Sequence, residues 1–491
     1  MNGVNRWLVL ATVIVGTFLG RLDQTIVNLA LPKIISSFSI TVTSAAWIAT
    51  AYIIANAVFV PVWGKLGDTI GRKKIYIWGF MIFIVGSVLA GFAWNLSSMI
   101  IFRIIQAIAS SADYPTAMAI LTMTFPPGRE RSRALGIWSG AFAASAVFGP
   151  LIGGPLIDAF GWRSVFFLNI PVGLVGLAMA FAYIKESVSE RKSTEFDWNG
   201  ALTLGVALST LVLVLDRGTT WGWFSVNSLL CYLITIVFSL LFYYIEKTHK
   251  EPIIDFKFFK IGAFTNALVN NFLVFMCMMG SIFLIPVFAQ TFLGYTATES
   301  GYLFIPMGLA IPIAAAVGAQ FSSRVSPRII IFISTAGAAL GFFLLSFIDP
   351  KSTALDISMP LMVMAIFMGF GMAQRTNIIA SVVPQSEIGI ASGILALARN
   401  IGGAFGIAIF GTVLLDSEKR NVIAIAARSV IHSVDPAIIR QGIALIEFKA
   451  QVAAYGEVFL LGSVCMFLAA FPVLLLRLNR DAAAVHVHVE A

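Results

Sequence analysis

The chain has 491 residues, of which 59% are hydrophobic and only 11% are charged, and its mean hydropathy is +0.92. This composition excludes an ordinary soluble protein and favours an integral membrane protein. The net charge of +8 comes from cations scattered through short loops, which argues against a nucleic-acid partner. The three cysteines, Cys231, Cys277 and Cys465, fall in apolar segments without a ligand spacing. We therefore expect neither a disulfide nor a metal site.

Fourteen apolar stretches approach the roughly 20 residues that a membrane-spanning helix needs. The first continues past Arg21 and Asp23 without a convincing cleavage site, so we interpret it as an uncleaved span rather than a signal peptide. The chain is thus predicted to be an all-α polytopic membrane protein. The spans are predicted near 7–31, 45–64, 75–95, 98–124, 134–158, 164–184, 198–216, 226–246, 263–290, 300–320, 328–348, 358–382, 388–414 and 454–477.

The distribution of cations between the loops orients these spans. With the N-terminus inside, the predicted cytoplasmic segments hold nineteen lysines and arginines, whereas the short outer loops hold four. Such an excess of inner cations is typical of membrane proteins, so both termini are predicted to be cytoplasmic. An odd number of spans would destroy the asymmetry.

The stretch 415–453 is longer than the other connections and carries five further cations. Apolar positions between Val422 and Ile446 recur at helical spacing. They predict one or two amphipathic helices that lie on the outer face, although a solvated loop fits the stretch equally well.

Six charged residues remain within the predicted spans, where each costs about 2.5–3.5 kcal/mol and therefore lines a pathway or pairs with another charge. On a helical wheel, Asp23 points about 160° away from Arg21, so these two should not pair. Asp23 and Arg103 both fall in the outer half of the membrane, and we predict that they form an ion pair. The other in-span charges are Asp113, Arg375 and Arg399. Arg21 shares a polar, cavity-lining face with Thr17, Gln24, Thr25 and Asn28.

A glycine-rich stretch with charges follows the second span, and a positive-inside loop alone would not explain its spaced glycines or its acid. Gly64, Asp68, Gly71 and Arg72 occupy the defining positions. The sequence predicts a tight, water-facing turn that places Asp68 at the start of the next helix, one turn from Arg72. The stretch resembles the loop signature of the major facilitator superfamily. The resemblance implies that this loop braces the closed cytoplasmic side of a transporter.

Further motifs resemble the fourteen-span drug:proton antiporters of that superfamily. Residues 22–32 are similar to their first-span motif, and 102–106, which include Arg103 and Gln106, are similar to the fourth-span motif implicated in proton transfer. Span 5 resembles the antiporter signature G-P-x-x-G-G with Gly149, Pro150, Gly153 and Gly154. The resemblance implies the major facilitator fold: two six-helix halves (1–184 and 263–491, the second including 415–453), with two inserted spans in 185–262.

The chain departs from the pattern in span 4, where Ala107 and Ala109 replace usual glycines and Asp113 adds an acid. This leaves open whether Asp23 or Asp113 carries the proton, with Arg103 as the partner. The candidate cavity lining is completed by Gln106, Tyr114, Arg375 and Arg399, and Asp113 is the candidate counter-charge for a cation.

The function implied by the resemblance is proton-coupled export of amphipathic, cationic drugs by alternating access, in a bacterial plasma (inner) membrane. The alternative is a proton-coupled transporter dedicated to one metabolite or anionic compound. We found no motif of an enzyme and expect no cofactor beyond the proton gradient. The expected partners are amphipathic substrates, protons, the lipid bilayer and, in a host with an outer membrane, a periplasmic adaptor.

Overall fold

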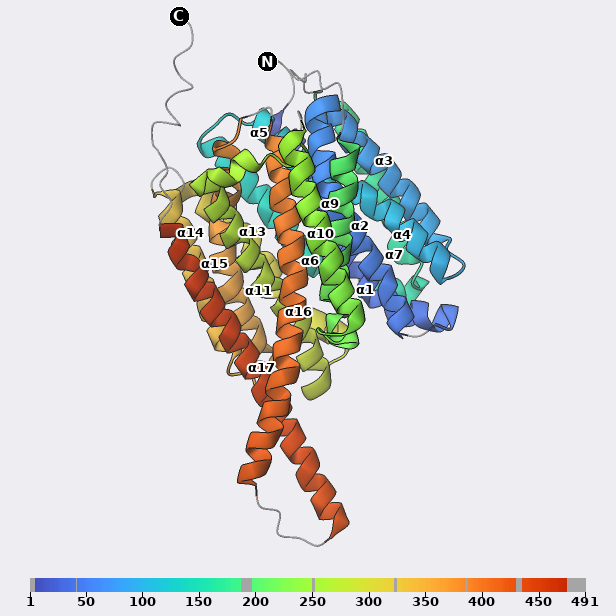
Figure 1. Cartoon of the computed structure of the whole chain (residues 1–491), viewed down its shortest axis with the longest axis vertical. Coiled ribbons are helices and arrows are strands. Elements are labelled where there is room, and N and C mark those ends of the chain that lie inside the picture. Colours follow the sequence, from blue (N-terminus) through green and yellow to red (C-terminus); the bar gives the residue numbers. More distant parts are fainter. Residues whose placement is uncertain are drawn as a thin grey trace, which may run out of the picture.

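The structure is a computed structural model that describes residues 5–40, 42–186, 197–249, 252–321, 325–384, 387–429 and 435–474. Every regular element in these ranges is a helix (Figure 1). In chain order the helices are α1 (Arg6–Phe38), α2 (Val42–Ile70), α3 (Arg72–Gly91), α4 (Leu96–Ser110), α5 (Asp113–Thr124), α6 (Arg129–Phe160), α7 (Ser164–Phe167), α8 (Asn169–Tyr183), α9 (Trp198–Trp221), α10 (Val226–Thr248), the short 3₁₀ helix η1 (Phe256–Lys260), α11 (Gly262–Phe292), α12 (Ala297–Tyr302), α13 (Ile305–Phe321), α14 (Pro327–Leu345), α15 (Ala354–Ser381), α16 (Ile388–Arg428) and α17 (Pro436–Leu474).

The predicted all-α membrane architecture is confirmed. Within the described residues, 13 helical stretches are long and apolar enough to cross a membrane. The 32-residue α6 takes the place of the predicted span near 134–158 and packs between α1 and α13. Three predicted spans are interrupted helices: α4 with α5, α7 with α8, and α12 with α13.

The helices gather into two sets that meet along a long seam. Helices α1 to α8, the N-terminal set, pack mainly on one another, and so do α11 to α17, the C-terminal set. Across the seam, α2 packs on α16 and α6 packs on α13 and α15. The paired helices α9 and α10 stand beside α16 in Figure 1, and α9 contacts both α2 and α16. The seam is therefore where side chains from both sets can meet.

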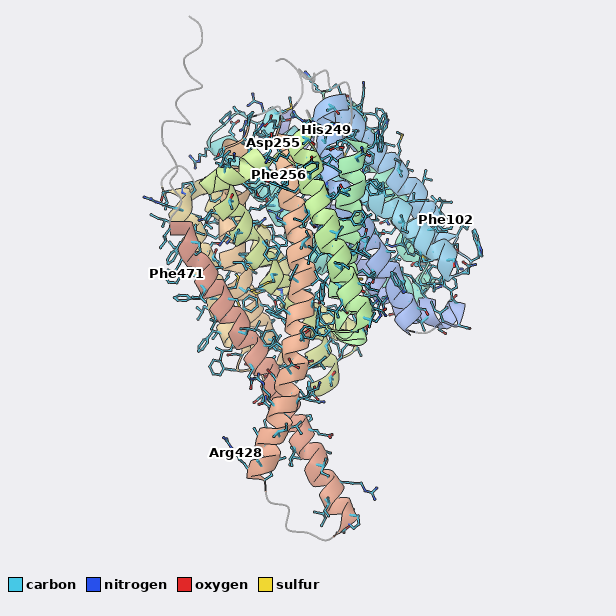
Figure 2. All side chains as sticks on the ribbon, in the orientation of Figure 1. Phe102, His249, Asp255, Phe256, Arg428 and Phe471 are labelled. Carbon is cyan, nitrogen blue, oxygen red and sulfur yellow. The ribbon has the colours of Figure 1, made fainter. Side chains whose placement is uncertain are left out.

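The two ends of the bundle differ. The start of α1 and the end of α17 lie at one end, called here the terminal end, and α16 and α17 project from the other, the hairpin end (Figure 1). Figure 2 shows Arg428 at the tip of this projection and Asp255 at the opposite end. In the projection, Gln451 Nε2 donates to Glu418 Oε1 over 2.9 Å. The described part of 415–453 is thus helical, but its helices continue two spans outward and do not lie on the outer face as predicted.

The predicted loop at residues 64–71 is mostly helix. Gly64 and Asp68 belong to the last turns of α2, and only Gly71, with φ +116°, breaks the helix before Arg72 starts α3. Residues with a side chain rarely adopt this φ, which accounts for glycine at position 71. The chain reversal is therefore shorter than predicted. Gly64 lies inside α2, where it allows close packing against another helix, and takes no part in the reversal.

Candidate functional site

Asp23 and Arg103 form a buried ion pair, as the sequence predicted. Arg103 Nη1 lies 2.5 Å from Asp23 Oδ2, and the two side chains are 2% and 0% exposed. The Arg103 guanidinium also rests over the Tyr52 ring, 4.1 Å from its centroid. A buried carboxylate needs such a partner because burial removes its hydration, and removal of either member would leave an uncompensated charge. Whether the pair couples protons to transport stays a prediction.

Neutral side chains complete the surroundings of Asp23. Gln106 Nε2 and Asn169 Nδ2 both donate to Asp23 Oδ1, over 2.9 and 2.8 Å, and both also donate to Ser87 Oγ. The cluster thus joins α1, α3, α4 and α8. Sequence reasoning did not place Ser87 or Asn169 here, although a serine inside an apolar span and an asparagine at the start of another were the available signals.

Asp113 lies against the same helix as Asp23, two turns nearer the terminal end. Its Oδ1 lies 3.0 Å from where a Cβ on Gly16 would stand, and Gly16 precedes Asp23 by seven residues on α1. This Oδ1 is buried and has no hydrogen-bond partner among the described residues. Two acids therefore lie along α1: Asp23 on the helix itself, with donors to both oxygens, and Asp113 packed against it, with one oxygen unsatisfied among the described residues.

A small central cavity lies between the two sets of helices. It is lined by Thr17, Gly20, Arg21, Gln24, Asn56, Val60, Ser110, Ser111, Asp113, Tyr114, Phe142, Ala396 and Asn400. Four of the predicted lining residues, Thr17, Arg21, Gln24 and Tyr114, are in this set. The cavity volume is about 20 Å³, room for about one water molecule. The structure therefore represents a state closed around the site.

Polar contacts across the seam bound this cavity. Arg21 Nη1 donates to Gln24 Oε1 over 2.7 Å, and its Nη2 donates to Asn400 Oδ1 over 3.4 Å. Asn400 Nδ2 in turn donates to Asn56 Oδ1 over 3.0 Å. Asn56 and Asn400 were not among the predicted lining residues, because single-helix periodicity does not tell which faces meet across two halves.

Arg399 stands on the C-terminal side of the cavity, and Arg375 does not reach it. The Arg399 guanidinium contacts the Tyr114 hydroxyl and lies 5.6 Å from the Phe142 ring centroid, whereas Arg21 lies 4.2 Å from the same centroid. Arg375 instead donates to Asn270 Oδ1 over 2.8 Å and to two hydroxyls within the C-terminal set. Its predicted position in the cavity lining is therefore wrong, because these neutral groups hold it between α11, α14 and α15. Gln106, also predicted to line the cavity, is occupied by Asp23.

Asp68 connects the two sets at the terminal end. Arg72 Nη2 pairs with Asp68 Oδ1 at 2.8 Å, as predicted. The helix start that Asp68 meets is that of α16 and not that of α3. Its carboxylate accepts from the backbone N–H groups of Gly389 and Ile390 over 3.3 and 3.0 Å. These N–H groups have no partner inside the helix and lie at its positive end, so a carboxylate is favoured there.

A second contact holds the start of α16 from η1, which precedes α11. Lys257 Nζ lies 3.0 Å from Glu387 Oε1 and 2.7 Å from Asp255 Oδ2. Burial lowers the pKa of the Lys257 ammonium, but the bonds to the two carboxylates outweigh it and raise that pKa above its ordinary value. The ammonium is therefore charged at physiological pH.

The three predicted glycines of span 5 lie on two faces of α6. A Cβ on Gly149 would stand 2.0 Å from Thr25 Oγ1, and one on Gly153 would stand 2.3 Å from Ile26 Cγ1, both on α1. A Cβ on Gly154 would meet only Thr298 Oγ1, at 3.5 Å. Close approach of α1 and α6 thus depends on the first two glycines. The side chains of Pro150 and Asn28, also predicted site residues, lie outside the described part of the structure.

The chain matches the sequence profile of the Major Facilitator Superfamily over residues 13–407. The chain belongs to this superfamily. It is 31% identical to Multidrug resistance protein 3 of Bacillus subtilis over 401 residues, 82% of this chain and 78% of that protein. It is 29% identical to Multidrug export protein EmrB of Haemophilus influenzae over 392 residues, 79% of this chain and 77% of that protein.

A solved transporter structure shares the fold. The crystal structure of the human organic anion transporter MFSD10 superimposes with a TM-score of 0.66 at 13% identity, covering 96% of this chain and 100% of that one. At this identity only the fold is shared. The Major Facilitator Superfamily membership makes the chain a multi-pass membrane transporter, in line with the resemblance seen in its motifs.

Proposed function

We propose that this protein is a proton-coupled exporter of amphipathic drugs that works by alternating access. The observation that carries the proposal is the Asp23–Arg103 pair, a buried acid held by a cation and two amide donors next to the cavity between the halves. The multidrug resistance and export proteins that the chain resembles support the drug class. In this proposal residues 1–184 and 263–491 are the moving halves, and both termini are cytoplasmic in a bacterial plasma membrane.

The proposed coupling follows from the alternatives open to Asp23. As a carboxylate it is matched by Arg103, and as a neutral acid it would leave Arg103 free to seek another partner. Proton uptake by Asp23 therefore breaks the ion pair. This links protonation to a rearrangement of α1 against α4. Asp113 is the second candidate proton carrier, because one of its oxygens is buried without a hydrogen-bond partner within the described residues.

The test is export driven by an imposed pH gradient in inverted membrane vesicles, with ethidium as a lipophilic cation. Asp23→Asn should abolish gradient-driven transport but keep gradient-independent exchange of bound dye. The control Asp158→Asn, an exposed acid paired with Lys33, should transport normally. The double variant Asp23→Asn with Arg103→Gln shows whether any loss of folding comes from the unpaired arginine. Normal transport by Asp23→Asn together with loss in Asp113→Asn would assign the proton to Asp113.

A specific observation also favours anionic drugs as a second candidate. Arg21 and Arg399 approach the Phe142 ring from the two sets, and neither forms an ion pair with a carboxylate in the described residues. Asp113 is the one acid that lines the same cavity, and it supports the cationic preference. Comparing ethidium with the lipophilic anion 1-anilinonaphthalene-8-sulfonate in Asp113→Asn and Arg21→Gln decides between them. Loss of only the anion in Arg21→Gln, with the anion carried best by the wild type, would favour the second candidate.

A further inference from the structure

A second, larger cavity lies toward the hairpin end, between α2, α9, α11 and α16. Its volume is about 400 Å³, within the range of roughly 300–1,000 Å³ that small-molecule sites occupy. Its walls come from both sets of helices and from the inserted α9. Representative lining residues are Thr50, Asp216, Val287, Ala404 and Gly411.

This crevice faces the outside of the bundle, where lipid surrounds the helices. Ile53, Phe283, Val287 and Leu415 line it, and each keeps more than a third of its surface exposed. On a membrane protein, apolar side chains that are exposed between the two ends of the spans contact the bilayer. A lipophilic molecule could therefore reach the crevice from the membrane without passing through water.

One charged side chain, Asp216, is found among the lining residues. The Thr50 hydroxyl donates to Asp216 Oδ2 over 2.7 Å, and Arg217 Nε lies 3.2 Å from the same oxygen. Arg217 itself is not part of the lining, and its guanidinium rests on the Trp47 ring at 4.9 Å. Asp216 already has Arg217 as a counter-ion, but 37% of its side chain stays exposed, so its carboxylate is open to a lipophilic cation in the crevice.

The crevice also lies next to the central cavity along two helices. On α2, Thr50 precedes Asn56 by six residues, which places it about 9 Å nearer the hairpin end. On α16, Ala404 lies one turn beyond Asn400. The hydrogen bond between Asn56 and Asn400, at 3.0 Å, stands between the two cavities. Separation of α2 from α16 at this bond would join them.

We infer that this crevice is a membrane-facing binding site for lipophilic monocations, and that it exchanges substrate with the central cavity through the α2–α16 seam. Asp216 receives the positive charge, and the apolar walls receive the body of the molecule. The inference rests on the proposed export function and adds a substrate site to it. It also gives the inserted α9 a role, because α9 supplies the carboxylate.

Binding of tetraphenylphosphonium to the purified full-length protein in lipid nanodiscs tests the inference, with the isosteric anion tetraphenylborate as the charge control. An added Cβ at Gly411 meets no atom within 4 Å, so Gly411→Phe should fill the crevice without disturbing the helices. Asp216→Asn removes the charge and keeps the shape. Each variant should weaken tetraphenylphosphonium binding about tenfold, and Asp216→Asn should not weaken tetraphenylborate binding.

The matched control is Gly262→Phe at the terminal end, where an added Cβ also meets no atom. It should bind tetraphenylphosphonium as the wild type does, and thermal unfolding of all variants verifies their fold. Wild-type binding by Gly411→Phe, or loss of co-purified phospholipid instead of tetraphenylphosphonium, would overturn the inference. Ethidium export by the wild type in the same preparation keeps the two proposals separate, since its absence contradicts the export function and not the binding site.

Discussion

Two buried cations show how differently a charge can be held within this chain. Arg103 has Asp23 as counter-ion, whereas the partners of Arg375 among the described residues are all neutral acceptors: Asn270, Ser334, Thr335 and the Met368 carbonyl. These neutral acceptors neither gain nor lose a proton at physiological pH. Arg375 therefore serves the architecture of the C-terminal set, whereas Arg103 stays the candidate for the proposed coupling.

The role of Arg375 gives a stability prediction at the residue scale. Asn270→Ala removes the acceptor of Arg375 Nε and should destabilise the protein by about 1.5–3 kcal/mol, because a buried charged donor is left unsatisfied. Its neighbour Asn271 is equally buried, but its Nδ2 has no partner among the described residues, so Asn271→Ala should cost much less. Thermal unfolding of both variants in detergent provides the measurement. Equal destabilisation of the two would show that Arg375 does not depend on Asn270.

At the scale of elements, α6 connects the two sets: Gly149 and Gly153 face α1, and its other faces reach α12, α13 and α15. A side chain that forced α1 away from α6 would disturb the packing within the N-terminal set. The four-residue spacing puts Gly149 and Gly153 on one face of a helix, but the sequence did not tell that this face meets α1 or that Gly154 turns to α12.

Substitution of these glycines by alanine separates the two faces. Gly149→Ala and Gly153→Ala should each lower export and thermal stability, because the new methyl group overlaps Thr25 or Ile26 and overpacking costs about 1–3 kcal/mol. Gly154→Ala is the matched control, since its methyl group would be in ordinary contact with Thr298. Vesicle export and thermal unfolding of the three variants are the measurements. A Gly154→Ala defect as large as the other two would contradict the proposed packing role.

Much of the fold could be predicted from the sequence, because spans and loop charges are local signals. The Asp23–Arg103 pair was accessible too, since helix direction and depth place both residues at one level. The Asp68 contact with Gly389 and Ile390 was not, because it joins residues more than 300 positions apart and no periodicity encodes which helices meet. The direction of the α16–α17 projection was likewise missed, since helical spacing does not distinguish a helix lying on a surface from one leaving it.

At the scale of the whole molecule, the central cavity is closed, and a drug-sized substrate requires the seam to open. At the terminal end the closure combines Asp68 on the start of α16 with tight glycine packing, because a Cβ on Gly64 would stand 2.6 Å from the Gly389 carbonyl oxygen. At the hairpin end the Asn56–Asn400 bond and the crevice leave more room. The terminal end is thus the more firmly closed, and Asp68 supplies its charged contact between the sets.

Asp68→Asn should loosen this closure while leaving the substrate site intact. The asparagine oxygen can still accept from the Gly389 or Ile390 N–H, but the ion pair with Arg72 and the favourable interaction with the positive end of α16 are lost. A loss of about 1–2 kcal/mol shifts the balance between closed and open states by roughly five- to thirtyfold.

Hydrogen exchange of the amides at the start of α16 should therefore accelerate, and export turnover should fall. Substrate affinity should change little, because Asp68 does not line the central cavity. Glu130→Gln, which removes an exposed acid paired with Arg6 within the N-terminal set, serves as the control. A large loss of affinity with unchanged turnover and unchanged exchange at residues 388–392 would contradict a bracing role for Asp68, and would require that its charge act on the substrate site.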